Sequence, residues 1–564
     1  MNFKREIIKL LKEHIAKYTD FAESSIEVPP DTKMGDYAFP CFSLAKNLNK
    51  NPAQIAADLK KKIKVKSPLL AVEAKGPYLN FFLDKKSVIE AALKKICNEK
   101  EKYGAGAKQK EKVMVEFSQP NTHKEFHIGH LRNCCLGDAL SKVLSFYGFP
   151  VITANYINDT GAHVAKCLWI YKKFYDGKEP ENDKGRWLGQ IYAEATKKVE
   201  ENPQFKAEVD EVLQKLESKD PEIMRLWEKT KKWSMEGFMR IYKILNVKFD
   251  TWFFDNELIE PAKRIVEDMK KKGIVVESEG ALIADLERFN LHKVIILKSD
   301  GTTPYITKDF ELANQKFTKY KIDRSIYVVG VDQRLHFQQL FKILELYGFK
   351  QAKKCYHLSY ELVHLKEGKM SSRHGNAVLF LDLYELVRRK ALEEVEKRHK
   401  DWSKDEKKKA VEQITLAALK FGMVSIENNK VIIFDPDKAL DFEGESGPYI
   451  QYTHARICSI IKKASNKQKK VDYSLLREES EYVIVKKLMQ FPNIVEESAQ
   501  HYKVHNIARY LIELCQLFNN YYHSVKVIQD DKEVEASRLA LINAVRHVIR
   551  NGLNLLGIPS PERM

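Results

Sequence analysis

The chain has 564 residues and a formal net charge of +17, from 95 Lys and Arg against 78 Asp and Glu. This length predicts roughly two to four domains and excludes a small disulfide-stapled protein. The positive charge favours a polyanionic partner such as nucleic acid, although lysine-rich surfaces are often only well solvated.

Cysteine usage and hydropathy indicate the compartment. The eight cysteines include no Cys-x-x-Cys pair, and most lie among apolar residues of expected helices. We therefore expect buried, reduced thiols and a cytoplasmic protein. No apolar run approaches the roughly 20 residues of a membrane span, so the sequence predicts a soluble protein without a membrane partner.

Residues 1–106 predict a small α+β domain. Helical stretches alternate there with two extended runs that follow turns, at 35–40 and 76–83. Gly104-Ala105-Gly106 comes next and is followed by alternating lysines. This stretch predicts the linker that leaves the domain.

Residues 107–386 alternate strands with helices. Apolar, β-branched runs predict strands at 113–117, 151–154, 294–297 and 325–329. This alternation is typical of a parallel α/β sheet. A charged helical insertion is expected at about 182–242, with a solvated face. Residues 387–564 show an almost wholly helical pattern.

The most informative motif is His127-Ile128-Gly129-His130, which lies between a strand and loop and an apolar helical pattern. At the carboxyl end of a parallel strand, such a loop faces the site where nucleotides bind, and the helix dipole favours phosphates. Both histidines can donate to phosphate oxygens, and Gly129 lets a flat base approach the backbone.

A second motif lies downstream, in the run Lys369-Met370-Ser371-Ser372-Arg373. Lys369, on a mobile loop, can follow the charge of the departing pyrophosphate. Together the two motifs predict adenylate formation from ATP, which needs positioning and charge neutralisation rather than a nucleophile.

A metal site built from His123, His127 and His130 is the alternative for this segment. Zinc sites usually add Cys or carboxylate ligands at recognisable spacing, and none lies nearby. We therefore expect no metal ligands in the chain.

Residues 115–133, which include the His-Ile-Gly-His motif, resemble the signature segment of arginyl-tRNA synthetases. Similar segments follow in that family's order at 155–161, 300–305, 369–376, 447–456 and 556–564. The resemblance covers nearly the whole chain. It implies a Rossmann-type class I catalytic domain at 107–386, an N-terminal domain at 1–106 that contacts the tRNA elbow, and a helical stem-contact and anticodon-binding domain at 387–564.

The resemblance also implies the reaction. L-arginine and ATP, the latter with Mg2+, form arginyl-adenylate and pyrophosphate, and arginine then passes to the 2′-hydroxyl of the terminal adenosine of arginine tRNA. Activation is expected to require bound tRNA, and a monomer is expected. No protein-bound structural metal is implied.

Five residues match the family's arginine-binding positions. Glu116 and Asp309 match the acids that bind the guanidinium, and Tyr305 shares a helix face with Asp309. Asn121 and Gln333 match residues that hold the α-amino and carboxylate groups. A planar guanidinium with five donors favours such paired acceptors, whereas a lysine ammonium fits them poorly. Taken singly, Glu116 could instead pair with a lysine, Tyr305 could be core, and Asp309 could cap a helix.

The resemblance extends to ATP and tRNA. The residues expected to contact ATP are His127, Gly129, His130, Gly330, Asp332, His336, Lys369, Met370 and Ser371. Tyr78 and Asn80 match an N-terminal loop that meets the tRNA D-loop, although Lys75 replaces an asparagine common there. Tyr452 and Arg456 are expected to contact the tRNA backbone.

The chain departs from the class pattern at several positions. Ser372 stands where the class consensus has a second catalytic lysine, a loss that the arginyl family offsets with a lysine before the first motif. We therefore predict that Lys124 stabilises the transition-state phosphate. Asp255-Asn256 replaces a common Glu-Ser pair, and 535–538 stands where the family has Asp-Ala-Leu-Arg, with helix expected to persist.

Three other functions fit parts of the pattern. A small-molecule nucleotidylyltransferase also uses a His-x-Gly-His loop, but it needs no long helical C-terminal region. A tRNA-binding scaffold without catalysis would have no reason to keep the histidines and the acidic pocket. Another class I synthetase is the nearest alternative, and Glu116, Tyr305 and Asp309 favour arginine over it.

Overall fold

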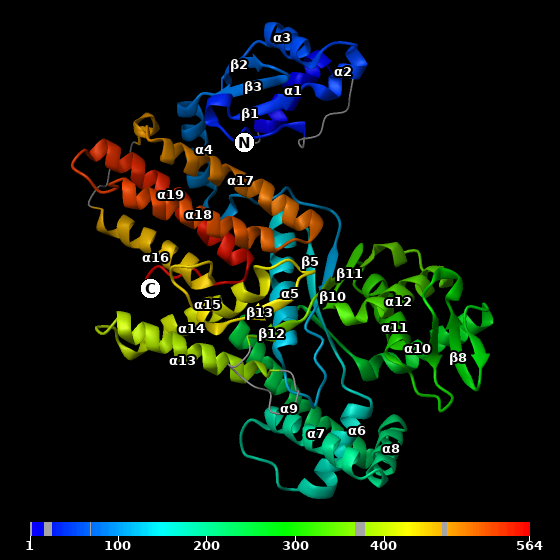
Figure 1. The fold of residues 1–564 in the computed structure, drawn as a ribbon. Helices are drawn as coiled ribbons and strands as arrows, with labels where there is room; N and C mark the ends of the chain where they lie inside the picture. The colour runs from blue at the N-terminus through cyan, green and yellow to red at the C-terminus, as the bar shows by residue number, and fades with distance from the viewer. Residues whose placement is uncertain (1–2, 16–24, 68, 367–377, 465–470) are drawn as a thin grey trace.

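The computed structural model describes residues 3–15, 25–67, 69–366, 378–464 and 471–564 (Figure 1). The N-terminal domain lies beside the C-terminal helices at one end of the molecule, and the helical insertion lies at the opposite end (Figure 1). The central sheet stands between them. In this described part, no helix is both long and apolar enough to cross a membrane.

The N-terminal region is α+β, as expected. Its antiparallel sheet has the order β1-β3-β2, and the two runs expected to be extended contain β1 and β3. The strands are β1 (Tyr37–Pro40), β2 (Leu69–Lys75) and β3 (Tyr78–Leu83), and the helices are α1 (Phe3–Ile15), α2 (Phe42–Leu48), α3 (Pro52–Lys62) and α4 (Lys85–Glu99). Apolar residues of α1, α3 and the sheet form a core of their own.

The central sheet is parallel, with the order β11-β10-β4-β5-β6. Its strands are β4 (Val113–Glu116), β5 (Val151–Ile157), β6 (Thr251–Phe254), β10 (Arg324–Gly330) and β11 (Cys355–Tyr360). Its helices are α5 (Ile128–Tyr147), α10 (Asp255–Lys271), α11 (Tyr305–Thr318) and α12 (Arg334–Tyr347). The chain runs from β4 outward to β6 and then returns to β10 on the other side of β4. Ligands bind at such a reversal, beyond the carboxyl ends of the strands.

One expected strand lies elsewhere. The run at 294–297 falls within β9 (Lys293–Leu297), which belongs to a separate antiparallel sheet with β7 (Val276–Ser278) and β8 (Ala281–Asp285). The prediction that it joins the parallel sheet was wrong. The connection 286–292 between β8 and β9 is too short for a parallel crossover, which takes a dozen or more residues.

The expected charged insertion is helical. It consists of α7 (Lys184–Glu201), α8 (Gln204–Glu217) and α9 (Pro221–Leu245), which pack on α6 (Ala162–Ile170) and a π-helical turn at Tyr171–Tyr175. Trp169, Leu188 and Trp233 lie in its core.

The C-terminal region is nearly all helical, as expected. Its helices are α13 (Phe380–Arg398), α14 (Lys404–Val424), α15 (Pro436–Ala439), α16 (Gly447–Lys463), α17 (Glu479–His501), α18 (His505–Ser524) and α19 (Lys532–Leu555). The exception is β13 (Ile432–Phe434), which pairs in parallel with β12 (Val363–Leu365). This pairing attaches the helical region to the chain just before residue 367.

Close packing of α5 against the end of β4 gives a first prediction. A Cβ added at Gly137 would lie 2.2 Å from Cγ of Phe117, the residue that follows Glu116. Gly137→Ala should therefore lower stability by about 1–3 kcal/mol through overpacking, seen as a lower midpoint in calorimetric unfolding. Gly237→Ala in α9 is the matched control, because its Cβ would meet only Gly185 Cα at 3.6 Å. An equal loss in both variants would contradict the packing argument.

Candidate active site

A cleft of about 660 Å³ opens at the carboxyl ends of β4 and β10. Its size suits a small-molecule substrate site. The residues predicted to contact arginine and ATP come together in its walls: Glu116, Asn121, Tyr305, Asp309 and Gln333, with His127, Gly129, His130, Gly330, Asp332 and His336. Lys369, Met370 and Ser371 lie outside the described residues.

The two motif histidines form the N-terminal cap of α5. The backbone N–H of His127 donates to Nδ1 of His130 at 3.2 Å. The backbone N–H of Gly129 donates to Nδ1 of His127 at 3.1 Å. Both Nδ1 atoms therefore accept, so each neutral ring carries its proton on Nε2. Burial first, and then the positive charge of Lys124, lowers the pKa of both rings, with His127 also lowering that of His130. The cap thus holds two neutral imidazoles, each with one Nε2–H donor free of the cap.

Gly129 is needed for the cap itself. A Cβ at this position would lie 2.9 Å from Cε1 of His127. The sequence analysis attributed this glycine to the approach of a flat base. The structure shows a second reason, because the His127 ring takes the space that a side chain at this position would need.

The described residues on the two sides of 367–377 lie at the cleft and beside the first motif, respectively. Before that segment, Leu362 and Val363 line the cleft. After it, Val378 accepts a hydrogen bond from the N–H of Ile128 at 2.8 Å.

Tyr305 and Asp309 lie one turn apart at the start of α11, as their spacing predicted. Tyr305 is 55% exposed, so it is not a core residue. Its hydroxyl accepts a hydrogen bond from Nδ2 of Asn158 at 2.9 Å, and Asn158 also donates to Oδ1 of Asn121 at 2.8 Å. Asp309 does not cap its helix. Its Oδ2 lies 2.6 Å from Nε2 of His336, which was expected on the ATP side of the cleft.

Glu116 faces the cleft and also pairs with a lysine. It is buried at the end of β4, with Oε2 2.6 Å from Nζ of Lys316, and Oε1 accepts from Nε2 of Gln119 at 3.1 Å. The alternative of a lysine partner for Glu116 is therefore confirmed, and Glu116 also lines the cleft. Sequence analysis missed Lys316. Its position two turns after Asp309 on the same helix was the available signal.

The departure at Asp255 lies at the centre of a second buried network that sequence analysis missed. Asp255 is fully buried at the start of α10 and accepts from the Tyr156 hydroxyl, from Thr160 Oγ1 at 2.6 Å and from Lys308 Nζ at 2.5 Å. Burial and then the charge of Asp255 raise the pKa of Tyr156 well above its usual value. Because Tyr156 lines the cleft, Asp255 fixes part of the cleft wall.

Lys124 lies beside the cleft without lining it. Its ammonium lies 4.9 Å from the ring centre of Tyr192 in the insertion, and it lines a neighbouring cavity with Arg186. It still lies near enough to contribute to the lowered pKa values of His127 and His130.

His123 does not share a site with the motif histidines. Its two ring nitrogens contact the hydroxyls of Thr122 and Thr230 at 2.9 and 2.8 Å, and the residue is fully buried. This pairing does not support the three-histidine metal alternative. Within the described ranges, no group of three or more His, Cys, Asp or Glu side chains is placed to hold a metal ion.

Arg132, five residues after the first motif histidine, ties the cleft wall to the helical region. Its guanidinium is almost fully buried and donates at 2.5–3.5 Å to five backbone carbonyls, those of Glu361, Leu362, Glu427, Asn428 and Lys430. Segment 361–363 lines the cleft, and 427–430 follows α14.

Arg132→Lys should raise the KM for ATP about tenfold and lower the unfolding midpoint, because an ammonium cannot reproduce the planar fork. Steady-state kinetics and calorimetry measure both effects. Arg538→Lys is the control, because the Arg538 guanidinium also donates to several acceptors but lies outside the cleft. An unchanged KM for ATP in Arg132→Lys would show that this bridge does not shape the cleft.

The residues predicted to contact tRNA lie on the N-terminal and C-terminal regions. Tyr78 is partly exposed at the start of β3 and meets Phe42 edge-on, whereas Asn80 is buried within the strand. Arg456 stacks on Tyr452, one turn away on α16, and donates to Oδ1 of Asn519 at 3.2 Å. Of the two N-terminal candidates, Tyr78 is thus the one with an accessible side chain.

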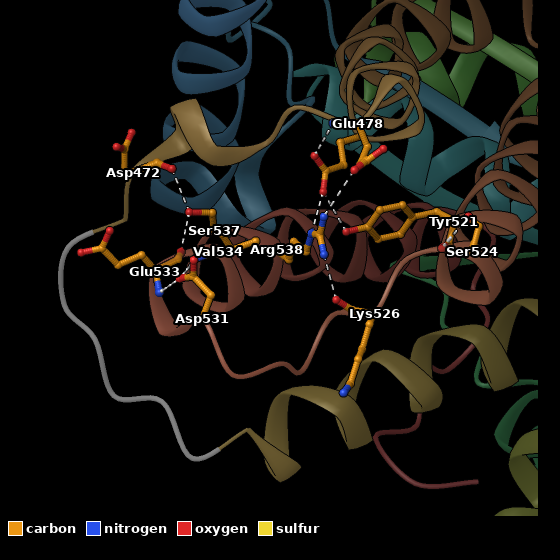
Figure 2. Close-up of polar contacts among 11 residues, drawn as sticks. Asp472, Glu478, Tyr521, Ser524, Lys526, Asp531, Glu533, Val534, Ser537 and Arg538 are labelled. Carbon is orange, nitrogen blue, oxygen red and sulfur yellow. Dashed lines mark hydrogen bonds and ion pairs between the residues drawn. The ribbon is translucent and has the colours of Figure 1, made fainter.

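The segment 535–538 lies within α19, so the expected helix persists. Figure 2 shows Arg538 between helices: its Nε donates to Oε1 of Glu481 at 2.9 Å, and Nη1 donates to the carbonyl of Lys526 at 2.9 Å. Tyr521 donates to the same carboxylate at 3.3 Å. Arg538 thereby joins α19 to α17 and to the segment that follows α18, and Glu481 links Tyr521 of α18 to the same cluster. The side chain of Lys526 points away from the cluster (Figure 2).

Three family models match the chain in the order of its regions. They are the arginyl tRNA synthetase N-terminal domain at residues 4–83, the class I (R) tRNA synthetase catalytic domain at 92–435, and the DALR anticodon binding domain at 450–564.

Relatives match along the full length. The arginine–tRNA ligase of Bdellovibrio bacteriovorus is 38% identical, with 98% of each chain covered, and that of Halothermothrix orenii is 36% identical, with all of both chains covered. The solved arginyl-tRNA synthetase of Thermus thermophilus superposes with a TM-score of 0.83 at 27% identity, covering all of both chains. These matches show that the chain belongs to the arginyl-tRNA synthetase family of class I aminoacyl-tRNA synthetases.

Proposed function

We propose that the chain is an arginine–tRNA ligase that forms arginyl-adenylate from L-arginine and ATP and then transfers arginine to arginine tRNA. One observation carries this proposal: a single cleft brings the Nε2–H donors of His127 and His130 together with the carboxylates of Glu116 and Asp309. The first pair suits phosphate oxygens, and the second suits a guanidinium.

In the reaction, a carboxylate oxygen of arginine forms a bond to the α-phosphorus of ATP. The bond from that phosphorus to the oxygen that bridges the α- and β-phosphates breaks, and this oxygen leaves with pyrophosphate. Charge builds on the phosphate oxygens as pyrophosphate leaves, and His127 and His130 donate to them from the start of α5, where the helix dipole adds to the effect. ATP is expected as its Mg2+ complex, with the metal held by phosphate oxygens. Gly330, the last residue of β10, and Asp332, just after it, border the ribose side.

On the arginine side, Asp309 and Glu116 accept from the guanidinium. Asn121 and Gln333 hold the α-amino and carboxylate groups, and the link from Asn158 to both Asn121 and Tyr305 orients that wall. A lysine ammonium would leave part of this acceptor set unpaired, which disfavours lysine.

For transition-state charge we propose Lys124 in place of the lysine missing at Ser372. Lys124→Ala should reduce the activation rate by about 10- to 100-fold, with the KM for arginine nearly unchanged. Single-turnover adenylate formation measures this directly, and Lys166→Ala, on α6 and outside the cleft, serves as the control. An unchanged rate in Lys124→Ala would remove this residue from the mechanism.

For tRNA we propose contacts by Tyr78 in the N-terminal domain and by Tyr452 and Arg456 on α16. Activation is expected to depend on bound tRNA. The 2′-hydroxyl of the terminal adenosine then attacks the adenylate carbonyl, and AMP leaves.

The test is exchange of labelled pyrophosphate into ATP, with arginine or lysine, in the presence and absence of arginine tRNA. Exchange with arginine only when tRNA is present is the expected result. Exchange with lysine would overturn the assigned substrate. Tight tRNA binding without any exchange would favour a non-catalytic scaffold.

A further inference from the structure

We propose that Lys316 sets the charge of the arginine pocket by neutralising Glu116, which makes it a specificity-determining positioning residue. The net negative charge that meets the guanidinium then comes from Asp309, and Glu116 serves as a fixed hydrogen-bond acceptor. This inference rests on the proposed arginine site.

The geometry around Lys316 leaves its ammonium one carboxylate partner among the described side chains. The side chain is fully buried, and Nζ lies 2.6 Å from Oε2 of Glu116. Nζ also lies 3.5 Å from the ring centre of Tyr327 and 3.4 Å from Oγ of Ser325. A buried lysine is stabilised only where such partners replace water. The ammonium is therefore held against Glu116 rather than free to reach solvent.

The same contacts fix the direction of Glu116. Lys316 occupies the Oε2 side, and Gln119 donates to Oε1 at 3.1 Å. Gln119 is itself held, because Asn133 donates to its Oε1 at 3.0 Å. A carboxylate oxygen accepts more than one hydrogen bond, so Oε1 keeps a lone pair for a guanidinium N–H in the cleft.

The charges around the pocket then balance one guanidinium. The charges of Glu116 and Lys316 cancel on the β4 side of the pocket. Behind Tyr156, the charges of Asp255 and Lys308 also cancel, since Oδ2 of Asp255 lies 2.5 Å from Nζ of Lys308. Of the two carboxylates assigned to arginine, Asp309 alone then stays unbalanced, bordered by His336. Asp332 and Glu361 also line the cleft but are not assigned to arginine. Without Lys316 the pocket would hold a second unbalanced carboxylate next to the substrate.

The test is a double-mutant cycle of Lys316→Met, Glu116→Gln and the double variant, read as the KM for arginine and the KM for ATP in tRNA-dependent exchange. Lys316→Met should raise the KM for arginine about 10- to 100-fold with the KM for ATP unchanged. The reason is that Glu116 loses the partner that fixes its position and is left as an unpaired buried carboxylate, a cost that outweighs the added attraction for the guanidinium. Lys316→Arg should recover most of the loss, because it keeps the charge. The KM for arginine of the double variant should be lower than the product of the two single-variant increases predicts.

Lys420→Met is the matched control, because Lys420 is also fully buried and pairs with Asp138 at 2.8 Å, away from the cleft. It should lower the unfolding midpoint without changing the KM for arginine. Additive effects in the cycle, or an equal rise of both KM values in Lys316→Met, would overturn the inference. If Lys316→Met does not fold, Lys316→Arg decides: its KM for arginine should stay close to that of the unmodified chain, and a rise as large as the one expected for Lys316→Met would overturn the inference. Absence of arginine-dependent exchange in the unmodified chain would overturn the proposed function, and this inference with it.

Discussion

Asp309→Asn is expected to raise the KM for arginine by about 100- to 1000-fold, the largest effect of any pocket substitution. The asparagine removes the charge that balances the guanidinium and turns an amide N–H₂ towards its N–H donors. If the amide oxygen turns to the guanidinium instead, the amide N–H₂ faces Nε2 of His336, which Asp309 now meets at 2.6 Å. A lost charge-assisted pair of this kind costs about 2–5 kcal/mol. Arginine-dependent pyrophosphate exchange, titrated with arginine at saturating ATP and tRNA, gives the KM.

Glu311→Gln is the matched control for Asp309→Asn. Glu311 lies on the same helix, but its carboxylate accepts from Asn314 and Gln315 rather than facing the cleft. Its KM for arginine should stay within about twofold of the unmodified value. Equal effects in the two variants would mean that α11 is disturbed as a whole and that Asp309 is no special acceptor.

The sequence predicted those site residues that lie in contiguous motifs or share a helix face. His127 and His130 lie within four residues, and Tyr305 and Asp309 are one helical turn apart, so local geometry was enough to bring each pair together. Lys316 and the buried contacts of Asp255 were missed because the partners, Glu116 and Tyr156, lie on strands far away in the chain. A pattern in one sequence does not state which strand a helix packs against.

The fold was predictable from the sequence to a similar extent. The regular alternation after residue 113 predicted the parallel sheet, and the helical periodicity after about residue 390 predicted the C-terminal helices. The apolar run of β9 gave no information on the direction of its partner, since period-2 patterns are alike in both sheet types. Only the short connection 286–292 pointed to the antiparallel arrangement.

His130→Asn separates the cap from the chemistry at the start of α5. Asparagine can still accept from the N–H of His127, as Nδ1 of His130 does at 3.2 Å, but it lacks the Nε2–H donor. We expect stability to stay within about 1 kcal/mol while the activation rate falls about 100- to 1000-fold, which is the usual cost of losing one transition-state donor. Calorimetry and single-turnover adenylate formation measure the two effects. Loss of stability with little change in rate would assign His130 to the cap alone.

The same arrangement fixes the pH dependence of activation. Because burial lowers the pKa of His130 well below its usual value, the ring is neutral at pH 7 with Nδ1 accepting. Raising the pH from 6.5 to 8.5 removes no proton from this ring, so its titration should cause no fall in rate over that range. Acidification protonates Nδ1, which breaks the acceptor role and opens the cap, so the rate is lost as the pH falls through the lowered pKa. The opposite result would be an activation rate that falls as the pH is raised through about 6.5 and that does not fall in His130→Asn. It would mean that the His130 imidazolium is the active donor.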